Sequence, residues 1–523
     1  MRTQVLIIGG GATGTGLARD LALRGVSCIL AEQGDINHGA SGANHGYLHS
    51  GARYVSADPE GARECRQEAA IIRKIAPHCI EDCGGLWVAV EGDDEDYPAD
   101  FPALCQRCGI SAQAVDVKEA LAMEPSLSRK VIAAYWVGEA SIDPFRLALE
   151  NISQACRLGT ILLRHHQAIG FQRCGRRIQA VQLRNVLSGA EVTVEAQQVV
   201  NAAGAWADEV AALAGATIEM LYSKGTLIVT HQRITDRVIM RLRRPSSGDA
   251  LIPGGTVSIF GTSSVRLDTL EDIRPTIAEV DAMVEEGAAM LPVLETIRYI
   301  RAFAGVRPLI KPQSAKDDRE VSRGFSLFDH ESDGLANFAT ISGGKLTTFR
   351  LMAEKTADLV CHRLGVAEPC KTGTEPLPTS EASQWSTPGL GPKVWLQKKH
   401  PADRILCECE MVPQSGIESV VQAIREVGGH PDLRAIGLRT RAGKGPCQGS
   451  FCSAALTAFL YDQGIIAGQQ GLADLRDFLE ERWKGQRPIL WGTPLIQGEL
   501  KEALYSGLLG LELDDATGAN TLP

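Results

Sequence analysis

The chain has no long apolar run and no cluster of basic residues. A transmembrane helix needs about 18 or more consecutive apolar residues, and no such run is present. The formal net charge is −10 and no basic stripe stands out, which argues against nucleic acid as a general partner. Internal repeats and low-complexity tracts are also absent. The 523 residues, 44% hydrophobic and 22% charged, are instead typical of a globular protein of about two to four domains.

We expect no secretory signal either, because the N-terminal residues enter an apolar strand directly. We therefore expect a cytoplasmic protein, with any membrane contact made through a partner or a surface patch. Cytosolic thiols stay reduced, so the 14 cysteines do not predict a disulfide framework. Ten are scattered, as small buried hydrophobic side chains often are. Cys105 and Cys108 have metal-ligand spacing, but no second pair lies near them, which favours a structural role.

The first strand, turn and helix carry a dinucleotide-binding motif. Val5 to Ile8 is a short apolar run typical of a buried parallel strand. It leads into G-x-G-x-x-G, residues 9–14, whose glycines make the tight turn, admit a pyrophosphate and let helix and strand pack closely. The next apolar run ends at Glu32, where an acid would hold the ribose hydroxyls of an adenine dinucleotide. The alternative is a glycine-rich turn in another α/β fold.

Two further segments are predicted to lie against the cofactor. Residues 34–55 are rich in Gly, Ser, Asn and His, and their small residues would allow close approach to a cofactor ring. A surface turn with solvated histidines is the alternative there. Residues 198–206, QVVNAAGAW, form an apolar run that ends in small residues, which suits a backbone returning to the dinucleotide.

Two short motifs supply cations. Arg307 follows an apolar strand in AGVRPL, and a guanidinium can bind two phosphate oxygens at once. A surface ion pair is the alternative for an arginine. The sequence ISGGKLTTFR, 341–350, predicts a strand, a glycine turn and a helix, with Lys345 at the mouth of the helix N-terminus.

The middle of the chain predicts a second sheet. Residues 218–310 are β-rich, with one helix over 276–291, and we interpret them as a substrate-capping sheet inserted in the nucleotide domain. Before them, Asp143 and Pro144 have the character of an N-cap and a first helical residue. Residues 371–402 are rich in Thr, Ser, Pro and Gly and are predicted to be a linker.

Four cysteines beyond the linker form two closely spaced pairs. They are C-x-C at Cys407 and Cys409, and C-x4-C at Cys447 and Cys452. Four thiolates suit either zinc or an iron–sulfur cluster. Nearby glycines would leave backbone N–H groups open to cluster sulfides, and structural zinc sites more often use C-x2-C pairs, so a [2Fe–2S] cluster is favoured.

The chain resembles the FAD-dependent glycerol-3-phosphate dehydrogenases over nearly its whole length, and within them the large catalytic subunits of the anaerobic branch. The motifs that carry this resemblance are IIGGGATGTGLARDLALRG, NHGYLHSGARY, VVNAAGAW, AGVRPL, SRGF, GGKLTTFRLMAE, CEC…GPCQGSFC and FLEERWKG. GVRPL with GGKLTT is specific to that family and its near relatives. The four-cysteine segment is similar to the bacterioferritin-associated-ferredoxin-like [2Fe–2S] domain.

The resemblance implies an α/β fold: a glutathione-reductase-like FAD-binding Rossmann domain, an inserted antiparallel substrate domain and a small α-rich [2Fe–2S] domain. It implies oxidation of sn-glycerol 3-phosphate to dihydroxyacetone phosphate by hydride transfer to flavin N5. Electrons would pass through the [2Fe–2S] cluster and two partner subunits, one flavin-bearing and one an iron–sulfur membrane anchor, to menaquinone. The chain would then sit peripherally on the cytoplasmic face of the bacterial inner membrane.

The expected domains follow from this resemblance. An FAD oxidoreductase spans 1–370, followed by the linker 371–402, the [2Fe–2S] domain 403–463 and a helical tail 464–523. Within 1–370 the nucleotide-binding part is about 1–85, 140–215 and 325–370, and the substrate sheet is about 86–140 and 216–325.

The resemblance also assigns residues. Those assigned to substrate binding are Arg53, Tyr54, Arg307, Arg323 and Lys345. The predicted catalytic residues are Arg53, Arg307, Lys345 and His49; from chemistry alone the general base is His49 or His45. The predicted cofactor-binding residues are Gly9, Gly10, Gly11, Ala12, Thr13, Gly14, Glu32, Gln33, Ser41, Asn44, His45, Gly46, Ala203, Gly204, Gly344, Lys345, Leu346 and Thr347. The predicted metal ligands are Cys407, Cys409, Cys447 and Cys452.

Two other functions remain open from the residues. One is an FAD dehydrogenase of another polyol phosphate, or of a hydroxy or amino acid, with the same ferredoxin-like module. The other is a non-enzymatic redox sensor that signals the state of its cluster to a partner.

Overall fold

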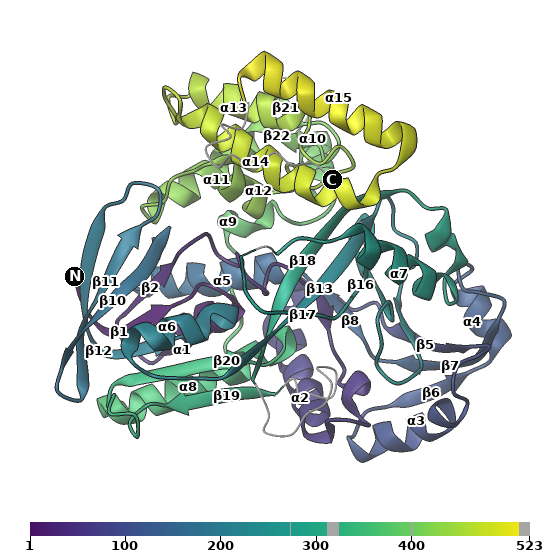
Figure 1. Cartoon of the computed structure of the whole chain (residues 1–523), viewed down its shortest axis with the longest axis horizontal. Coiled ribbons are helices and arrows are strands. Elements are labelled where there is room, and N and C mark those ends of the chain that lie inside the picture. Colours follow the sequence, from purple (N-terminus) through teal and green to yellow (C-terminus); the bar gives the residue numbers. More distant parts are fainter. Residues whose placement is uncertain (272, 311–323, 399, 401, 512–523) are drawn as a thin grey trace.

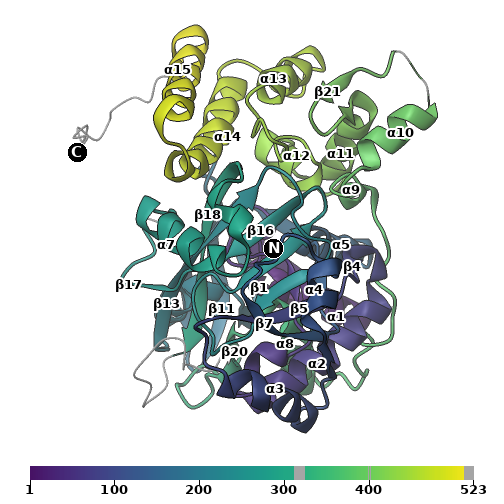
Figure 2. The same cartoon turned by 90° about the vertical axis from the view of Figure 1, so that its right-hand side faces the viewer.

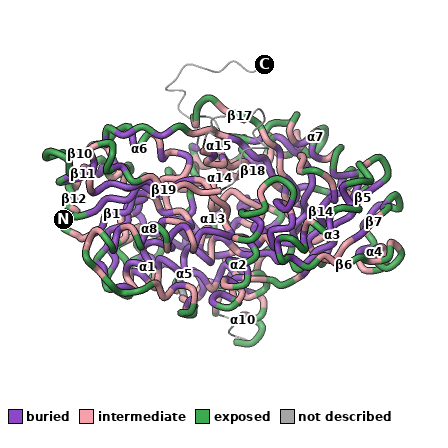
Figure 3. Tube along the Cα trace, turned by 90° about the horizontal axis from the view of Figure 1, so that it is seen from below, coloured by how far each residue is buried: buried purple, intermediate pink, exposed green. Residues whose placement is uncertain are grey.

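A computed structural model of the chain describes residues 1–271, 273–310, 324–398, 400 and 402–511. These residues form two large sheets, with a helical C-terminal region stacked on one side of them (Figure 1). Both sheets are largely buried, and the exposed residues gather at the outer turns (Figure 3). No helix in the described part of the chain is both long enough and apolar enough to cross a membrane.

The first sheet has a parallel centre in the order β9-β2-β1-β12-β20. Its bounds are β1 (Arg2–Ile8), β2 (Cys28–Glu32), β9 (Ile161–Arg164), β12 (Glu191–Asn201) and β20 (Phe338–Gly343). Three antiparallel strands extend it: β10 (His166–Cys174), β11 (Arg177–Asn185) and β19 (Phe325–Asp329). Because side chains alternate along a strand, Val5 and Ile7 bury on one face of β1 while Leu6 and Ile8 bury on the other.

Helices cover both faces of this sheet. The helix α1 (Ala12–Leu23) crosses from β1 to β2 and packs against α5 (Pro144–Arg157) and α8 (Phe349–Leu364). The predicted start of α5 is confirmed, since the Asp143 carboxylate accepts hydrogen bonds from the N–H groups of Phe145 (2.9 Å) and Arg146 (3.0 Å). On the other face lies α6 (Ala207–Ala214).

The second sheet has nine strands, mostly antiparallel, in the order β17-β13-β16-β15-β14-β5-β7-β6, with β18 also paired to β13. The exception is the parallel pair β14–β5. The bounds are β5 (Gly85–Val90), β6 (Ala112–Val115), β7 (Val131–Val137), β13 (Met220–Thr230), β14 (Val238–Arg241), β15 (Ala250–Gly254), β16 (Val257–Gly261), β17 (Val265–Leu267) and β18 (Tyr299–Ile310). The predicted helix over 276–291 is present as α7 (Ile277–Ala288), begun by a capping box between Thr276 and Glu279.

Short elements join the two sheets and cover the second. The three-stranded sheet β3-β8-β4 consists of β3 (Tyr47–Leu48), β8 (Ala140–Ile142) and β4 (Ile80–Glu81). It holds the segment 34–55 beside the cavity described below. The other helices of this part are α2 (Pro59–Ile75), α3 (Asp96–Arg107) and α4 (Val117–Met123).

The described residues of 371–402, the predicted linker, include helices and pack against neighbouring parts of the chain. These helices are α9 (Glu381–Gln384) and α10 (Leu390–Lys398). Trp385 is buried against the C-terminal region, and the hydroxyl of Ser383 donates to the buried Glu150 carboxylate at 2.5 Å. These long-range contacts hold the segment against α5.

The described residues 402–511 form a C-terminal region with a main apolar core and a smaller cluster in which Val420, Ile424 and Ala435 pack around Trp385. Its elements are β21 (Ile405–Cys407), β22 (Val412–Pro413), α11 (Gln414–Glu426), α12 (Leu433–Arg439), α13 (Cys452–Asp462), α14 (Gln470–Gln486) and α15 (Gly492–Leu509). Phe478 and Leu479 of α14 share a core with Cys407 and Cys452, so the described part of the helical tail packs on the segment that carries the four cysteines. The region lies above the ends of β18 and β16 (Figure 2).

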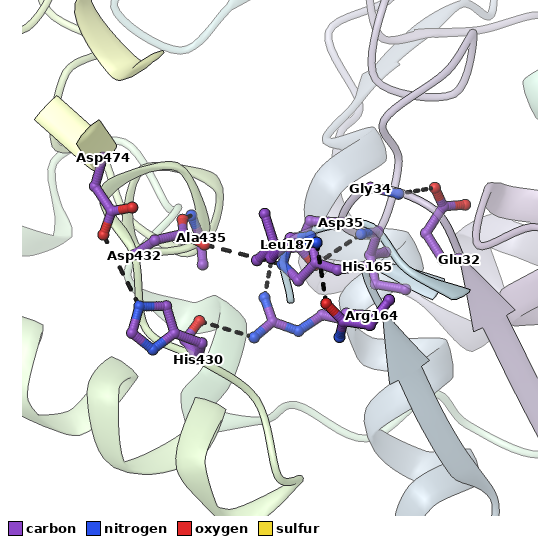
Figure 4. A network of polar contacts seen from close by, with 12 residues as sticks. Glu32, Gly34, Asp35, Arg164, His165, Leu187, His430, Asp432, Ala435 and Asp474 are labelled. Carbon is purple, nitrogen blue, oxygen red and sulfur yellow. Dashed lines mark hydrogen bonds and ion pairs between the residues drawn. The ribbon is translucent and has the colours of Figure 1, made fainter. Parts of the chain in front are cut away.

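A buried ionic contact attaches the C-terminal region to the first sheet (Figure 4). The Asp35 carboxylate, just after β2, accepts hydrogen bonds from Arg164 of β9 (2.7 Å) and from two nitrogens of Arg439 of α12 (2.8 and 3.0 Å). Arg164 also donates to the backbone carbonyl of His430 at 2.9 Å. Burial by itself would raise the pKa of Asp35, but Arg439 and Arg164 hold it well below its usual range.

We predict that Asp35→Asn lowers the free energy of unfolding by about 3 kcal/mol at pH 7, because two buried guanidiniums lose their counter-charge. The folded pKa lies below the unfolded value of about 3.9, so the stabilisation is complete above that pH and is lost as the pH falls. Denaturation series at several pH values should therefore show the wild-type advantage shrinking below about pH 4. Asp82→Asn, which breaks the exposed Arg73–Asp82 pair, is the matched control. A pH-independent difference would contradict the prediction.

Candidate active site

A cavity of about 300 Å³ lies where the carboxyl ends of β1 and β2 face the end of β18. A smaller one of about 120 Å³ adjoins it. Both are lined by His45, Tyr47, His49 and Arg307, so these side chains stand at their boundary. The larger cavity is lined by the glycine turn after β1 and the smaller by strands of the second sheet. The arrangement offers one compartment for a large group and another for a small ligand.

The glycine turn after β1 leaves no room for side chains at two of its positions. Gly9 has a φ of +114°, and a Cβ there would lie 2.4 Å from the carbonyl oxygen of Ala202. A Cβ on Gly14 would lie 2.0 Å from the carbonyl oxygen of Gly9. The N-cap of α1, Gly11, has no side chain, and the Ser41 hydroxyl accepts a hydrogen bond from the backbone N–H of Ala12 at 2.9 Å, so the positive helix end faces the cavity beside Ser41.

Glu32 organises the turn at the end of β2. Its carboxylate accepts hydrogen bonds from the N–H groups of Gly10 and Gly34, both at 2.7 Å. Burial raises its pKa, and these two hydrogen bonds oppose the rise. The side chain lines the cavity, where an acid bound to a dinucleotide ribose would stand.

Most of the predicted cofactor residues line the larger cavity, while three lie behind its wall. Gly14 packs under the turn, and Gly46, with a φ of +65°, makes a turn whose N–H donates to the Asn44 side chain at 2.8 Å. The Thr347 hydroxyl accepts a hydrogen bond from the backbone N–H of His49 at 3.1 Å. Thr347 therefore positions the segment that carries the predicted base.

Lys345 presents a buried ammonium to the larger cavity. Its side chain is 5% exposed, and Nζ has no hydrogen-bond partner among the described residues. The nearest groups are the ring of Tyr54, 4.5 Å to the centroid, and the Asp58 carboxylate at 3.9 Å. A buried cation without hydrogen bonds is costly, which points to an anionic or polar ligand that satisfies it.

Arg307 reaches across β13 toward the smaller cavity. It donates hydrogen bonds to the Ser223 hydroxyl (3.3 Å), the Thr262 hydroxyl and the backbone carbonyl of Ser263 (3.1 Å). Gly225 leaves room for it, since a Cβ there would lie 2.4 Å from Nη2. These three acceptors are neutral, and they orient the guanidinium at the cavity wall.

Arg53 is a second guanidinium on the smaller cavity. It donates to the Asp249 carboxylate (3.2 Å) and to the Ser246 carbonyl (3.3 Å). Asp249 is 1% exposed and also pairs with Arg243 at 3.0 Å. Arg323, predicted as a third cation, lies outside the described residues.

A row of rings separates the two cavities. The ring centroids lie 5.7 Å apart for His45–Tyr47, 3.8 Å for Tyr47–His49 and 5.3 Å for His49–Tyr54. Behind them the fully buried Glu139 accepts hydrogen bonds from Ser50 N (2.8 Å), Ser50 Oγ (2.6 Å) and Trp87 Nε1 (3.3 Å). Burial raises the pKa of Glu139. The sequence did not predict this residue, because a single acid outside any motif carries no local signal.

The four predicted metal ligands come together in the C-terminal region. Sγ–Sγ distances are 3.8 Å for Cys407–Cys409 and 3.7 Å for Cys409–Cys447, and Cys452 lies beside Cys407. Backbone N–H groups, including that of Gly443, donate to the sulfurs. Among the described residues, no group of three or more His, Cys, Asp or Glu is arranged to hold a metal ion as it stands. None of the 14 cysteines forms a disulfide bond in this structure.

Comparison with known proteins identifies the class. Residues 4–359 match the family described as FAD dependent oxidoreductase. The chain belongs to this family and is an oxidoreductase. Its glycine turn, its small-residue wall and the buried ammonium of Lys345 fit a bound dinucleotide flavin.

The similarity to individual proteins extends over the C-terminal region. A relative from Escherichia coli (strain K12), named as one subunit of anaerobic glycerol-3-phosphate dehydrogenase, is 41% identical across 98% of this chain and 97% of its own. The protein of the same name from Haemophilus influenzae is 39% identical across 98% and 94%. A similarly named protein from Haloferax volcanii is 35% identical across 98% and 92%.

Solved structures share the fold. The FAD complex of glycerol-3-phosphate dehydrogenase from Bacillus halodurans superposes with a TM-score of 0.65 at 20% identity, covering 94% of this chain and 96% of that one. L-alpha-glycerophosphate oxidase from Mycoplasma pneumoniae with FAD bound gives 0.57 at 18% identity, covering 73% and 100%. At these identities the likeness concerns the fold alone.

We predict that Gly14→Ala abolishes retention of FAD, because its methyl group would force the Gly9 carbonyl out of the turn. The measurement is the ratio of flavin to protein absorbance after purification. Gly138→Ala, at a glycine with no atom within 4 Å of the added Cβ, should keep full FAD content. Equal FAD content in both variants would show that the turn does not hold the cofactor.

Proposed function

We propose that this oxidoreductase converts sn-glycerol 3-phosphate to dihydroxyacetone phosphate with bound FAD. The observation that carries the proposal is the pair of guanidiniums, Arg307 and Arg53, on one small cavity beside a larger cofactor-sized one. A dianionic phosphate is the ligand that two guanidiniums suit best. The names of the relatives and of the two structural neighbours point to the same substrate.

Arg307 is one of the two phosphate ligands in this proposal. Its hydrogen bonds to Ser223, Thr262 and Ser263 go to neutral acceptors, which hold the guanidinium in place at the cavity. The Asp249 carboxylate partly neutralises the charge of Arg53. Arg53 would therefore orient the phosphate more than attract it. With the phosphate held there, the C2 carbon of the substrate would lie toward the rings and the larger cavity.

When bound, FAD supplies the acceptor for the hydride that leaves C2. The chain must then remove the C2 hydroxyl proton, and His49, on both cavities and held by Thr347 through its backbone, is the base that we favour over His45. Lys345 would hold the substrate in position relative to the cofactor ring. The N-terminus of α8, which has no side-chain cap, would stabilise negative charge at the cofactor.

Anaerobic addition of glycerol 3-phosphate to the FAD-loaded protein should bleach the flavin. We predict that Arg307→Ala raises the substrate concentration needed for half-bleaching by about 10- to 100-fold, the loss expected for charged hydrogen bonds of about 1.5–3 kcal/mol. The measurement is flavin absorbance against substrate concentration, with FAD content checked separately.

Arg298→Ala, an exposed position next to the same strand, is the control and should behave as wild type. Bleaching of the wild type by glycerol or a hydroxy acid as readily as by glycerol 3-phosphate would overturn the phosphate-binding role. No bleaching by any of these, with FAD bound, would favour the sensor alternative.

We further propose that the four cysteines hold a [2Fe–2S] cluster that passes electrons on. The close thiols, the N–H donors to sulfur and the tight packing of Gly445, where a Cβ would lie 2.4 Å from the Sγ of Cys409, suit an anionic cluster. The electrons would go to a flavin-bearing partner subunit, then through an iron–sulfur anchor subunit to menaquinone at the inner membrane. Relatives named as subunits of a larger enzyme support such an assembly.

We predict that Cys447→Ser abolishes stoichiometric iron and the cluster absorbance, because one of four thiolate ligands is lost, while substrate still bleaches the flavin. Iron analysis and anaerobic visible spectra measure the two effects separately. Cys174→Ser, at an exposed cysteine of β10, should keep the iron. Stoichiometric zinc without iron in the wild type would decide against the redox role.

A further inference from the structure

A buried carboxylate that the proposed reaction leaves unused lies behind the row of rings. Glu139 follows β7 and precedes β8, is 0% exposed, and has its pKa raised by burial. The groups that donate to it, Ser50 N, Ser50 Oγ and Trp87 Nε1, are all neutral. A buried acid with a shifted pKa beside a cavity is a candidate for a functional role.

Both oxygens of Glu139 act as acceptors. A backbone N–H and an indole N–H can only donate. The Ser50 hydroxyl itself accepts a hydrogen bond from the backbone N–H of Ala52 at 3.2 Å, which leaves its own proton for Glu139 Oε1 at 2.6 Å. This is the pattern of a carboxylate that accepts and does not donate. Glu139 is therefore suited to hold N–H and O–H groups in place.

Glu139 and Thr347 hold two consecutive backbone N–H groups of the site. The N–H of Ser50 donates to Glu139 Oε2 at 2.8 Å, and the N–H of His49 donates to the Thr347 hydroxyl at 3.1 Å. Thr347 follows β20 of the first sheet, whereas Glu139 follows β7 of the second. His49 is thus fixed between side chains from both sheets, at the boundary of the two cavities.

The side chain of Tyr47 lies beside both Glu139 and His49. Its ring centroid is 3.8 Å from that of His49. Burial, and next the Glu139 carboxylate, raise the pKa of Tyr47 well above its usual value. The carboxylate therefore supports His49 in two ways, through the Ser50 backbone and through the Tyr47 ring.

The second sheet has space for this carboxylate. A Cβ on Gly85, at the start of β5, would lie 2.7 Å from Cγ of Glu139. Trp87, two residues further along the same strand, is 1% exposed and supplies the indole donor. Because side chains alternate along a strand, positions 85 and 87 share the face that meets Glu139. The core of the second sheet therefore fixes where the carboxylate lies.

We propose that Glu139 is a positioning residue that holds His49 in reach of the substrate hydroxyl. This rests on the proposed function, in which His49 takes the C2 hydroxyl proton. Glu139 is not among the residues that line the two cavities, so it acts through the Ser50 backbone. It keeps its hydrogen bonds throughout and neither gains nor loses a proton. Its loss should therefore slow the reaction more than it weakens substrate binding.

The test compares Glu139→Gln with the wild type in the full-length, FAD-loaded chain. Anaerobic stopped-flow bleaching of the flavin at several concentrations of glycerol 3-phosphate gives the limiting rate and the half-saturating concentration. A glutamine replaces one acceptor oxygen with an NH2 donor, so a Ser50 hydrogen bond is lost. The limiting rate should fall by about 10- to 100-fold, since a base displaced by about 1 Å costs about 100-fold. The half-saturating concentration should change less than about threefold, because Arg307 keeps its contacts with Ser223 and Ser263.

Glu124→Gln is the matched control, because it makes the same change at another buried carboxylate. Glu124 is 3% exposed and accepts hydrogen bonds from the backbone N–H of Asp236 (3.1 Å) and from Arg237 (3.0 Å). Its variant should keep the wild-type limiting rate and FAD content. Ser50→Ala, which removes the hydroxyl and keeps the backbone N–H, should lower the limiting rate by about 3- to 10-fold, the worth of one hydrogen bond. If Glu139→Gln retains no FAD, the rate of Ser50→Ala decides.

The outcomes separate the positioning role from the function. An unchanged limiting rate in Glu139→Gln, or in Ser50→Ala where the first variant retains no FAD, would overturn the positioning role and leave the proposed function standing. A raised half-saturating concentration at an unchanged limiting rate would overturn it as well, since Glu139 would then act on binding. An equal fall in Glu124→Gln would show a general loss of packing and would also contradict it. No bleaching of the FAD-loaded wild type by glycerol 3-phosphate would overturn the proposed function itself.

Discussion

The close approach of backbone at the end of β1 is the constraint on which the rest of the site depends. Gly9 passes so near Ala202 that a methyl group would reach the carbonyl oxygen, and Gly14 packs equally closely on Gly9. The turn after β1, the first turn of α1 and the residues after β12 therefore meet at one sheet edge with their backbones in contact. Because the parallel strands β2, β1 and β12 end together there, the cavity opens at that edge and is walled by small residues.

The C-terminal region contacts the second sheet mainly along β18, and Ile489 also lies in the core of that sheet. Arg307 stands near the end of β18, and α14 packs on the beginning of the same strand, where Arg301 pairs with Glu481 at 2.9 Å. On the other side Asp35 ties Arg439 to the turn that follows Glu32. The region that carries the four cysteines is thus attached both to β18 and to the turn after β2.

Features that depend on neighbouring residues were predictable from the sequence, whereas contacts between distant segments were not. Asp143 as a helix cap and the helix after Thr276 were predicted because capping involves neighbours in the sequence. The Thr, Ser and Pro content of 371–402 predicts a linker, but it does not predict that Trp385 packs on α11, which lies further along the chain. Glu139 was missed for the same reason, as its three donors come from Ser50 and Trp87.

The sequence by itself determined the dinucleotide turn, the order of motifs and the spacing of the two cysteine pairs, because each depends on residues within one turn or one strand. Only the tertiary structure decided that Arg53 and Arg307 share a cavity, that Lys345 is buried without a hydrogen bond among the described residues, and that the tail closes over the four-cysteine site. The physical reason is that burial and charge proximity arise from segments hundreds of residues apart, and only packing brings these together.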